Sequence, residues 1–193
     1  MNIFRKYESL DQFQVPNKVL MIFGPRQVGK TTLMENFLAQ TPLRSKIVTG
    51  DDITIHKPLG TQNLTEIKAF CEGYELIAID EAHKIPNIGM GLKLMTDHIK
   101  GVRVVATGSS SFELAGQTGE PLTGRKTTLH LWPVSQMELL HHFNRFELKE
   151  KLAEFLIYGS YPAVVAARSA EEKKRILMEI TGSYLFRDIL EFE

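Results

Sequence analysis

Short, mostly apolar runs alternate along most of the chain with longer segments in which apolar residues have helical spacing. The runs are the predicted strands: residues 19–23, 46–49, 76–79, 102–107 and 129–132. An apolar run of this length is typical of a strand that is buried on both faces of a parallel sheet. Pro133 closes the last run, because proline donates no hydrogen bond to a neighbouring strand.

Between the strands, apolar residues recur every three or four positions, as they do on one face of a helix. This spacing predicts one helix after residue 29, one from Leu64 to Phe70 that stops at Gly73, and one over residues 88–99. Strands that alternate with helices of this length predict an α/β fold, with a parallel sheet in three layers and right-handed crossovers.

The N-terminal segment and one later segment lack this alternation. Between Ile3 and Phe13 the apolar spacing predicts a short helix, which Pro16 ends. Residues 115–127 are rich in Gly, Thr and other polar residues, so we expect a mobile surface loop there.

Beyond residue 135 the strand pattern stops, and two amphipathic helices are predicted. The first carries Leu148, Leu152, Phe155 and Leu156, and the second carries Ile176, Leu177, Ile180 and Tyr184. We therefore divide the chain into a core of residues 1–134 and a helical lid or linker subdomain of residues 135–193.

Composition limits the classes of protein that fit this pattern. The chain has 193 residues, of which 43% are hydrophobic, as in a soluble globular domain. The formal net charge is zero, so no overall basic field supports nucleic-acid binding. No apolar run approaches the roughly 20 residues that span a bilayer, and we expect a cytoplasmic protein. The one cysteine, Cys71, lies in a predicted amphipathic helix, where we expect a buried, inert thiol.

A phosphate-binding loop lies between the first strand and the first helix. Its G-x-x-x-x-G-K-[ST] pattern is complete: Gly24, Pro25, Arg26, Gln27, Val28, Gly29, Lys30 and Thr31. The two glycines allow turns that point successive amides at phosphate oxygens, and the helix N-terminus adds further amides. Lys30 supplies charge for the β- and γ-phosphates, and the Thr31 hydroxyl is placed to coordinate Mg²⁺. The alternative is a glycine turn before an ordinary helix, which the strand and helix context disfavours.

Two carboxylates follow the third strand, at the edge of the sheet where α/β folds bind ligands. We expect Asp80 to hold the Mg²⁺ shell opposite Thr31, and Glu81 to polarise the attacking water as a general base. Without the phosphate-binding loop, we would give equal weight to the alternative that Asp80 and Glu81 only cap the following segment.

Two further positions are candidates for contact with the γ-phosphate. Ser109 is the first choice for a hydroxyl sensor after the fourth strand and Thr107 the second; alternatively, these residues cap a helix that begins near Phe112. Arg125 is a candidate charge stabiliser, in its own chain or toward a neighbouring subunit, although a loop arginine is often only solvated. Arg26 is a weaker candidate for a phosphate or sheet-edge contact.

These segments together resemble a prokaryotic family of AAA+-like ATPases, which pair the ATPase domain with a C-terminal domain of unknown function. The segments that carry the resemblance are residues 24–32, 79–83, 107–111, 122–125 and 132–138, with looser likeness at 158–162 and 185–189. The resemblance implies a P-loop fold of the additional-strand type with sheet order 5-1-4-3-2, adenine as the base, and Thr32 among the binding residues. It also implies that Glu81 activates water and that the Thr-Gly-Ser segment is the sensor.

The chain departs from that family at its end. It stops at Glu193, where the family continues into its second domain, so we expect either a truncated chain or a shortened member. In both cases we expect the effector output to be missing and the last helix to expose Ile180, Tyr184 and Ile189.

The leading hypothesis is a Mg²⁺-dependent ATP hydrolase. A second hypothesis is an ATP-gated switch or interaction module that turns over slowly. A third is a small-molecule kinase, which ranks last because the 115–127 loop offers only Arg125 as a lid arginine. Besides ATP, the expected partners are another copy of the chain, if Arg125 acts between subunits, or an unknown protein effector.

Overall fold

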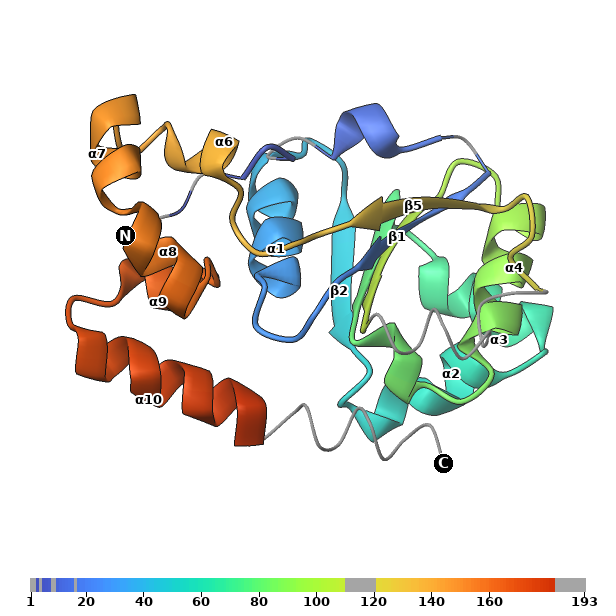
Figure 1. Cartoon of the computed structure of the whole chain (residues 1–193). Helices are drawn as coiled ribbons and strands as arrows, with labels where there is room; N and C mark the ends of the chain where they lie inside the picture. The colour runs from blue at the N-terminus through green and yellow to red at the C-terminus, as the bar shows by residue number, and fades with distance from the viewer. Residues whose placement is uncertain (1–2, 4, 8–9, 16, 110–120, 183–193) are drawn as a thin grey trace. The chain divides into compact units, whose positions relative to one another are not determined.

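A computed structural model of the chain describes residues 3, 5–7, 10–15, 17–109 and 121–182 (Figure 1). The chain divides into two compact units. The sheet unit comprises residues 9–24 and 30–130, and the helical unit comprises residues 1–8, 25–29 and 131–193. Within the described residues, no helix has the length and apolar character that a membrane crossing requires.

Among the described residues of the sheet unit, five parallel strands form one sheet. They are β1 (Val19–Phe23), β2 (Ser45–Thr49), β3 (Leu76–Asp80), β4 (Arg103–Gly108) and β5 (Lys126–His130). Their order across the sheet is β2-β3-β4-β1-β5, with every neighbouring pair parallel. The predicted parallel sheet and its order, 5-1-4-3-2 read from the other edge, are therefore confirmed.

The strand register places the carboxyl ends together. Phe23 of β1 lies opposite Gly108 of β4 and His130 of β5, and Thr49 of β2 lies opposite Asp80 of β3. We call this side of the sheet the carboxyl edge. Side chains that follow β1, β3 and β4 emerge there, although they are far apart in the sequence.

Helices cover both faces of the sheet, as Figure 1 shows, with α1 on one face and α2, α3 and α4 on the other. Their bounds are α1 (Lys30–Gln40), α2 (His56–Gly60), α3 (Leu64–Cys71) and α4 (Ile88–His98), with 3-10 turns η1 (Asp11–Phe13), η2 (Ile53–Ile55) and η3 (Ala82–Lys84). The buried core between sheet and helices includes Met21, Ile79 and Ala106 from the strands and Leu59, Ile67 and Leu92 from the helices.

Two details show how closely this core is packed. Gly91 of α4 lies against α2, because an added Cβ would approach the Leu59 carbonyl oxygen to 2.0 Å. Cys71 is 2% exposed, and burial raises the pKa of its thiol to about 11. The expected burial of this thiol is confirmed.

In the part of the helical unit that the structure describes, five short helices surround a small core of their own. They are α6 (Gln136–Leu139), α7 (Arg145–Glu150), α8 (Leu152–Tyr158), α9 (Pro162–Ala166) and α10 (Ala170–Ile180). Capping boxes begin α6 and α7: Ser135 pairs with Glu138, and Asn144 pairs with Glu147. The core is formed by Val134, Leu139 and Leu148.

Three predicted elements differ from the structure. Among the described residues of the N-terminal segment, the helical element is the single turn η1 rather than a helix from Ile3. Strand β5 begins at Lys126, not residue 129, so the predicted mobile loop extends too far. The reason is that β5 is an edge strand, whose polar first residues pair with β1 without being buried in apolar surroundings.

The third difference concerns the helix predicted on Leu148, Leu152 and Leu156. The backbone at Lys151, with ψ of 1°, interrupts it and separates α7 from α8. Leu148 is buried, whereas Leu152 is 53% and Leu156 77% exposed, so the predicted apolar face is not one continuous surface.

The expected exposure of the last helix is wrong at the position that can be checked. Ile180 is 8% exposed at the end of α10. Tyr184 and Ile189 lie outside the described residues.

Candidate active site

The phosphate-binding pattern forms the connection between β1 and α1. Gln27 has φ of 59° and Gly29 has φ of 99°, both in the left-handed region. Such residues reverse the direction of successive peptide planes, which lets amides of one short loop converge on an anion. An added Cβ at Gly29 would meet nothing within 4 Å, so the backbone conformation, not crowding, requires glycine there.

Side chains in this segment differ in exposure. Val28 and Lys30 are buried, Pro25 and Arg26 are half-buried, and Gln27 and Thr32 are exposed. Of the residues expected to bind the nucleotide, some would therefore act through their backbone amides and others through their side chains.

Lys30 is the first residue of α1 and is 5% exposed. Its Nζ donates a hydrogen bond of 2.9 Å to the carbonyl oxygen of Gly24, the first residue of the motif. The ammonium group is thus held beside the start of the loop, near the positive end of an 11-residue helix. This is an arrangement that attracts an anion.

Asp80 joins three elements of the sheet unit. Its Oδ2 accepts from the Thr31 hydroxyl of α1 at 2.8 Å, and its Oδ1 accepts from the Thr107 hydroxyl of β4 at 2.5 Å. The two residues expected to hold the metal, Thr31 and Asp80, are therefore in direct contact. Hydroxyl and carboxylate oxygens are ligands that Mg²⁺ accepts.

Glu81 follows Asp80 in an unusual backbone conformation, with φ of 48° and ψ of 41°. Its N–H donates to the Thr107 hydroxyl oxygen at 2.9 Å. Thr107 thus links the backbone of Glu81 to the carboxylate of Asp80. The side chain of Glu81 contacts His83, whose Nε2 lies 3.3 Å from Glu81 Oε2.

Three residues take part in this arrangement in ways that the sequence pattern did not predict. Thr107 was only the second choice for a sensor, and its contacts depend on the β3–β4 register. Gly50 faces the Glu81 carbonyl oxygen, which an added Cβ would approach to 2.2 Å. His83 had a visible signal, since it stands two residues after Glu81 in the segment 79–83 that carried the family resemblance.

Ser109, the first choice for a sensor, is 5% exposed and directly follows β4 at the carboxyl edge. Its position is thus on the same side of the sheet as Asp80. The helix that would begin near Phe112 lies outside the described residues, so the capping alternative stays open.

Arg125 lies at the opposite edge of the sheet. Its carbonyl oxygen accepts from Val19 N–H, at the start of β1, and its Nε lies 2.7 Å from Asp97 Oδ1 near the end of α4. The structure does not bring this guanidinium together with Lys30 and Asp80 of its own chain. A role toward a neighbouring subunit stays a prediction.

Within the helical unit, Arg5 connects the phosphate loop to the segment before α6. It donates a long hydrogen bond of 3.5 Å to the Val28 carbonyl oxygen and one of 2.5 Å to that of Trp132. Its Nε also lies 3.2 Å from Glu138 Oε1. The arginine that binds the Val28 carbonyl oxygen of the loop thus also forms a mostly buried ion pair with Glu138.

Glu138 is 6% exposed, and both of its carboxylate oxygens accept hydrogen bonds from backbone N–H groups. Burial raises its pKa, but hydrogen bonds from the backbone of Ser135 and Lys6, together with the charge of Arg5, outweigh burial and hold the pKa below its ordinary value. The carboxylate is therefore ionised in the folded chain at neutral pH.

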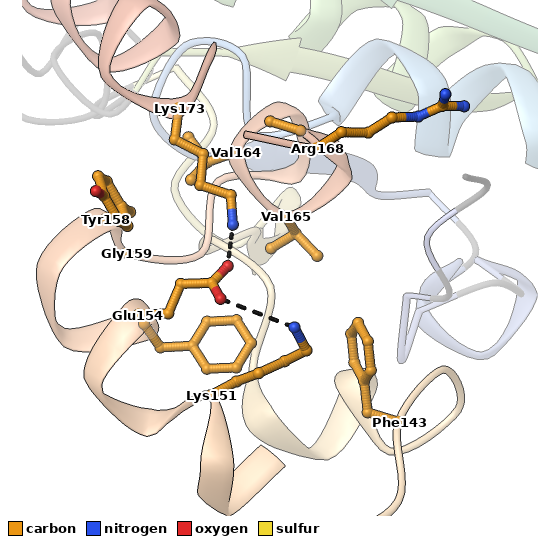
Figure 2. A pocket seen from close by; sticks show the side chains of 11 residues that line it. Phe143, Lys151, Glu154, Tyr158, Gly159, Val164, Val165, Arg168 and Lys173 are labelled. Carbon is orange, nitrogen blue, oxygen red and sulfur yellow. Dashed lines mark hydrogen bonds and ion pairs between the residues drawn. The ribbon is translucent and has the colours of Figure 1, made fainter. Parts of the chain in front are cut away.

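Figure 2 shows a second charged cluster of the helical unit, in a pocket of about 270 Å³. The Glu154 carboxylate lies between two ammonium groups: it contacts Lys173 and lies 3.8 Å from Lys151 Nζ. Burial, and secondarily the charge of Lys151, lowers the pKa of Lys173. Because the Glu154 carboxylate lies between the two cations, we interpret this cluster as a contact that holds α8 and α10 together.

The sequence profile of a family described as an AAA domain matches residues 16–140. An uncharacterized protein of Methanocaldococcus jannaschii is 26% identical over 92% of this chain and 43% of its own length. One of Haemophilus influenzae is 36% identical over 94% of this chain and 48% of its own length. The chain thus spans less than half the length of each of these relatives.

Two solved structures have a similar fold. The Walker-type ATPase of Pyrococcus abyssi matches with a TM-score of 0.60 at 12% identity, over 98% of this chain and 75% of that one. A Signal Transduction ATPase with Numerous Domains of Pyrococcus horikoshii, which carries a tetratricopeptide repeat sensor, matches with a TM-score of 0.55 at 19% identity. That match covers 85% of this chain and 29% of the other, and both likenesses concern the fold alone.

Proposed function

Because this chain belongs to the family described as the AAA domain, we propose that it binds ATP with Mg²⁺ and hydrolyses the γ-phosphate. The observation that supports this most directly is the contact of Asp80 with Thr31 at the carboxyl edge of the sheet. The contact joins Thr31, which follows Lys30 of the phosphate-binding pattern, to a carboxylate 49 positions away in the sequence. Neither residue needs the other to form its own helix or strand.

The donor set fits a magnesium ion. Mg²⁺ prefers oxygen ligands, keeps several waters, and is commonly held by one or two carboxylates together with phosphate oxygens. Thr31 and Asp80 would hold it, with the Asp80 carboxylate supplying the negative charge. When bound, Mg²⁺ would neutralise charge on the β- and γ-phosphates.

The residues of the chain itself would do the rest. Amides of residues 24–30 and the Lys30 ammonium would bind and orient the phosphates. Glu81 would accept a proton from water as the water oxygen bonds to the γ-phosphorus. The bond to the bridging oxygen then breaks, ADP leaves with that oxygen, and the proton on Glu81 returns to solvent.

The test is steady-state phosphate release by the wild type and by Glu81→Gln. We expect multiple turnovers of ATP that depend on Mg²⁺, and a loss of about 10²-fold to 10⁴-fold in the variant. The variant should still bind ATP, since the amide keeps the size of the side chain. Lys30→Ala is the binding control and should lose ATP affinity.

Other outcomes identify other functions. At most one phosphate released per chain would favour the ATP-gated switch. Loss of ATP that requires an acceptor and yields no free phosphate would favour a kinase. Unchanged turnover in Glu81→Gln would contradict the proposed role of Glu81.

A further inference from the structure

The contact between His83 and Glu81 suggests how the proposed general base is oriented. Nε2 of His83 lies 3.3 Å from Oε2 of Glu81, and the two side chains are 15% and 25% exposed. A carboxylate oxygen only accepts hydrogen bonds, so a hydrogen bond across this 3.3 Å contact requires the hydrogen on Nε2. In that tautomer the imidazole donates to the group that would remove a proton from water.

The backbone of Glu81 is fixed from three sides. Its N–H is bound to Thr107, and its conformation is left-handed. Its carbonyl oxygen faces Gly50, where there is no room for a Cβ. The side-chain dihedrals of Glu81 are then the freedom that remains, and a terminal carboxylate is the most mobile part of such a side chain.

The His83 backbone is also held in place. The η3 turn is closed by hydrogen bonds from Lys84 N–H to Glu81 at 3.0 Å and from Ile85 N–H to Ala82 at 3.1 Å. Ala82 is fully buried and anchors the turn, whereas the contact of Lys84 Nζ with Asp51 Oδ1 at 2.5 Å joins two exposed side chains and adds little. A ring carried by a braced turn can restrict a neighbouring flexible side chain.

We propose that His83 is a positioning residue, which holds the Glu81 carboxylate in the orientation that accepts the proton of the attacking water. The inference deepens the proposed function and rests on it. His83 does not touch the phosphates in this role, and it donates no proton to the reaction. Its effect belongs to the hydrolytic step, because misplacement of a catalytic group by about 1 Å costs as much as 10²-fold in rate.

The experiment compares two substitutions of His83 in the full chain. His83→Ala removes the donor, and we expect kcat for ATP hydrolysis to fall about tenfold with KM for ATP unchanged. His83→Gln restores an N–H donor on a side chain of similar reach, and we expect it to recover most of that loss. Single-turnover phosphate release would show that the change lies in hydrolysis and not in product release.

A matched control comes from the same turn. Lys84→Ala removes the contact to Asp51 but none to Glu81, so it reports on loosening of η3 alone and should keep kcat within about twofold. Thermal unfolding of all three variants would show that each is folded at the assay temperature.

The outcomes separate the two proposals. Wild-type hydrolysis with an unchanged or increased kcat in His83→Ala, or an equal loss in Lys84→Ala, overturns the role of His83 and leaves the ATPase intact. A higher KM alone, or no recovery in His83→Gln, also overturns it. Absence of turnover in the wild type overturns the proposed function, and the role of His83 with it.

Discussion

Two carboxylates in the two units of the chain are held in opposite ways. Asp80, in the sheet unit, accepts from the uncharged hydroxyls of Thr31 and Thr107. Glu138, in the helical unit, is paired with the Arg5 guanidinium and accepts from two backbone N–H groups. A carboxylate surrounded by hydroxyls keeps its charge available for a cation, whereas one matched by a guanidinium and amides serves to fasten segments together.

The largest expected effect is on hydrolysis at Asp80. Asp80→Asn keeps an acceptor for one hydroxyl but removes the charge that we assign to the metal site. We expect a loss of about 10³-fold in Mg²⁺-dependent phosphate release, since metal and charge stabilisation dominate phosphoryl transfer. Phosphate release over a range of Mg²⁺ concentrations measures it.

Glu154→Gln is the matched control for that prediction, because Glu154 lies between lysines in the helical unit. It should hydrolyse ATP at the wild-type rate. Equal activity of Asp80→Asn and the wild type would contradict the metal role of Asp80.

The next effect is on stability at Glu138. Glu138→Gln leaves the mostly buried Arg5 without its counter-charge, and we expect the free energy of unfolding to fall by about 2 kcal/mol. Urea unfolding at neutral pH measures it. A change below about 0.5 kcal/mol would show that solvent or another group compensates Arg5.

The pH dependence of the same residue gives a separate check. The pKa of Glu138 is lower in the folded chain than the ordinary value of 4.5, so the folded state binds its proton less readily than the unfolded state does. Its contribution to stability is then complete above about 4.5 and is lost as the pH falls through the folded pKa. Glu138→Gln should flatten the stability curve in that acidic range, and an unchanged curve would contradict the shift.

The smallest expected effect is at Arg125, on the edge of the sheet opposite Asp80. Arg125→Ala removes an exposed ion pair with Asp97, and we expect a change in Tm too small to separate from experimental scatter. Hydrolysis in dilute solution should also be unchanged. A loss of activity that appears only as protein concentration rises would instead support contact with the site of a neighbouring subunit.

Much of the fold follows from local pattern. The run Val19–Phe23 is a strand with the predicted bounds, and the segment of residues 88–99 is helix α4 within one residue. Apolar runs and helical spacing reflect burial on one or two faces, which each segment carries within its own sequence. The resemblance to AAA+-like ATPases is confirmed by the family match over residues 16–140.

Predictions from local apolar pattern were wrong in two segments, where the pattern does not follow which side chains are buried. β5 begins with Lys126 and two threonines, which pair with β1 at the edge of the sheet and therefore show little apolar pattern. The break at Lys151 likewise leaves the helical spacing of the leucines intact while turning Leu152 and Leu156 to solvent.

The sequence by itself determined the alternation of strands and helices in the sheet unit, the phosphate-binding pattern, and the acidic pair after β3, because each is a pattern within a short segment. Only the tertiary structure decided that Thr107 joins Asp80 across 27 positions, that Arg5 meets Glu138, and that Arg125 stands at the far edge. Strand register and the packing of distant segments set these contacts, and neither has a local signature in the sequence.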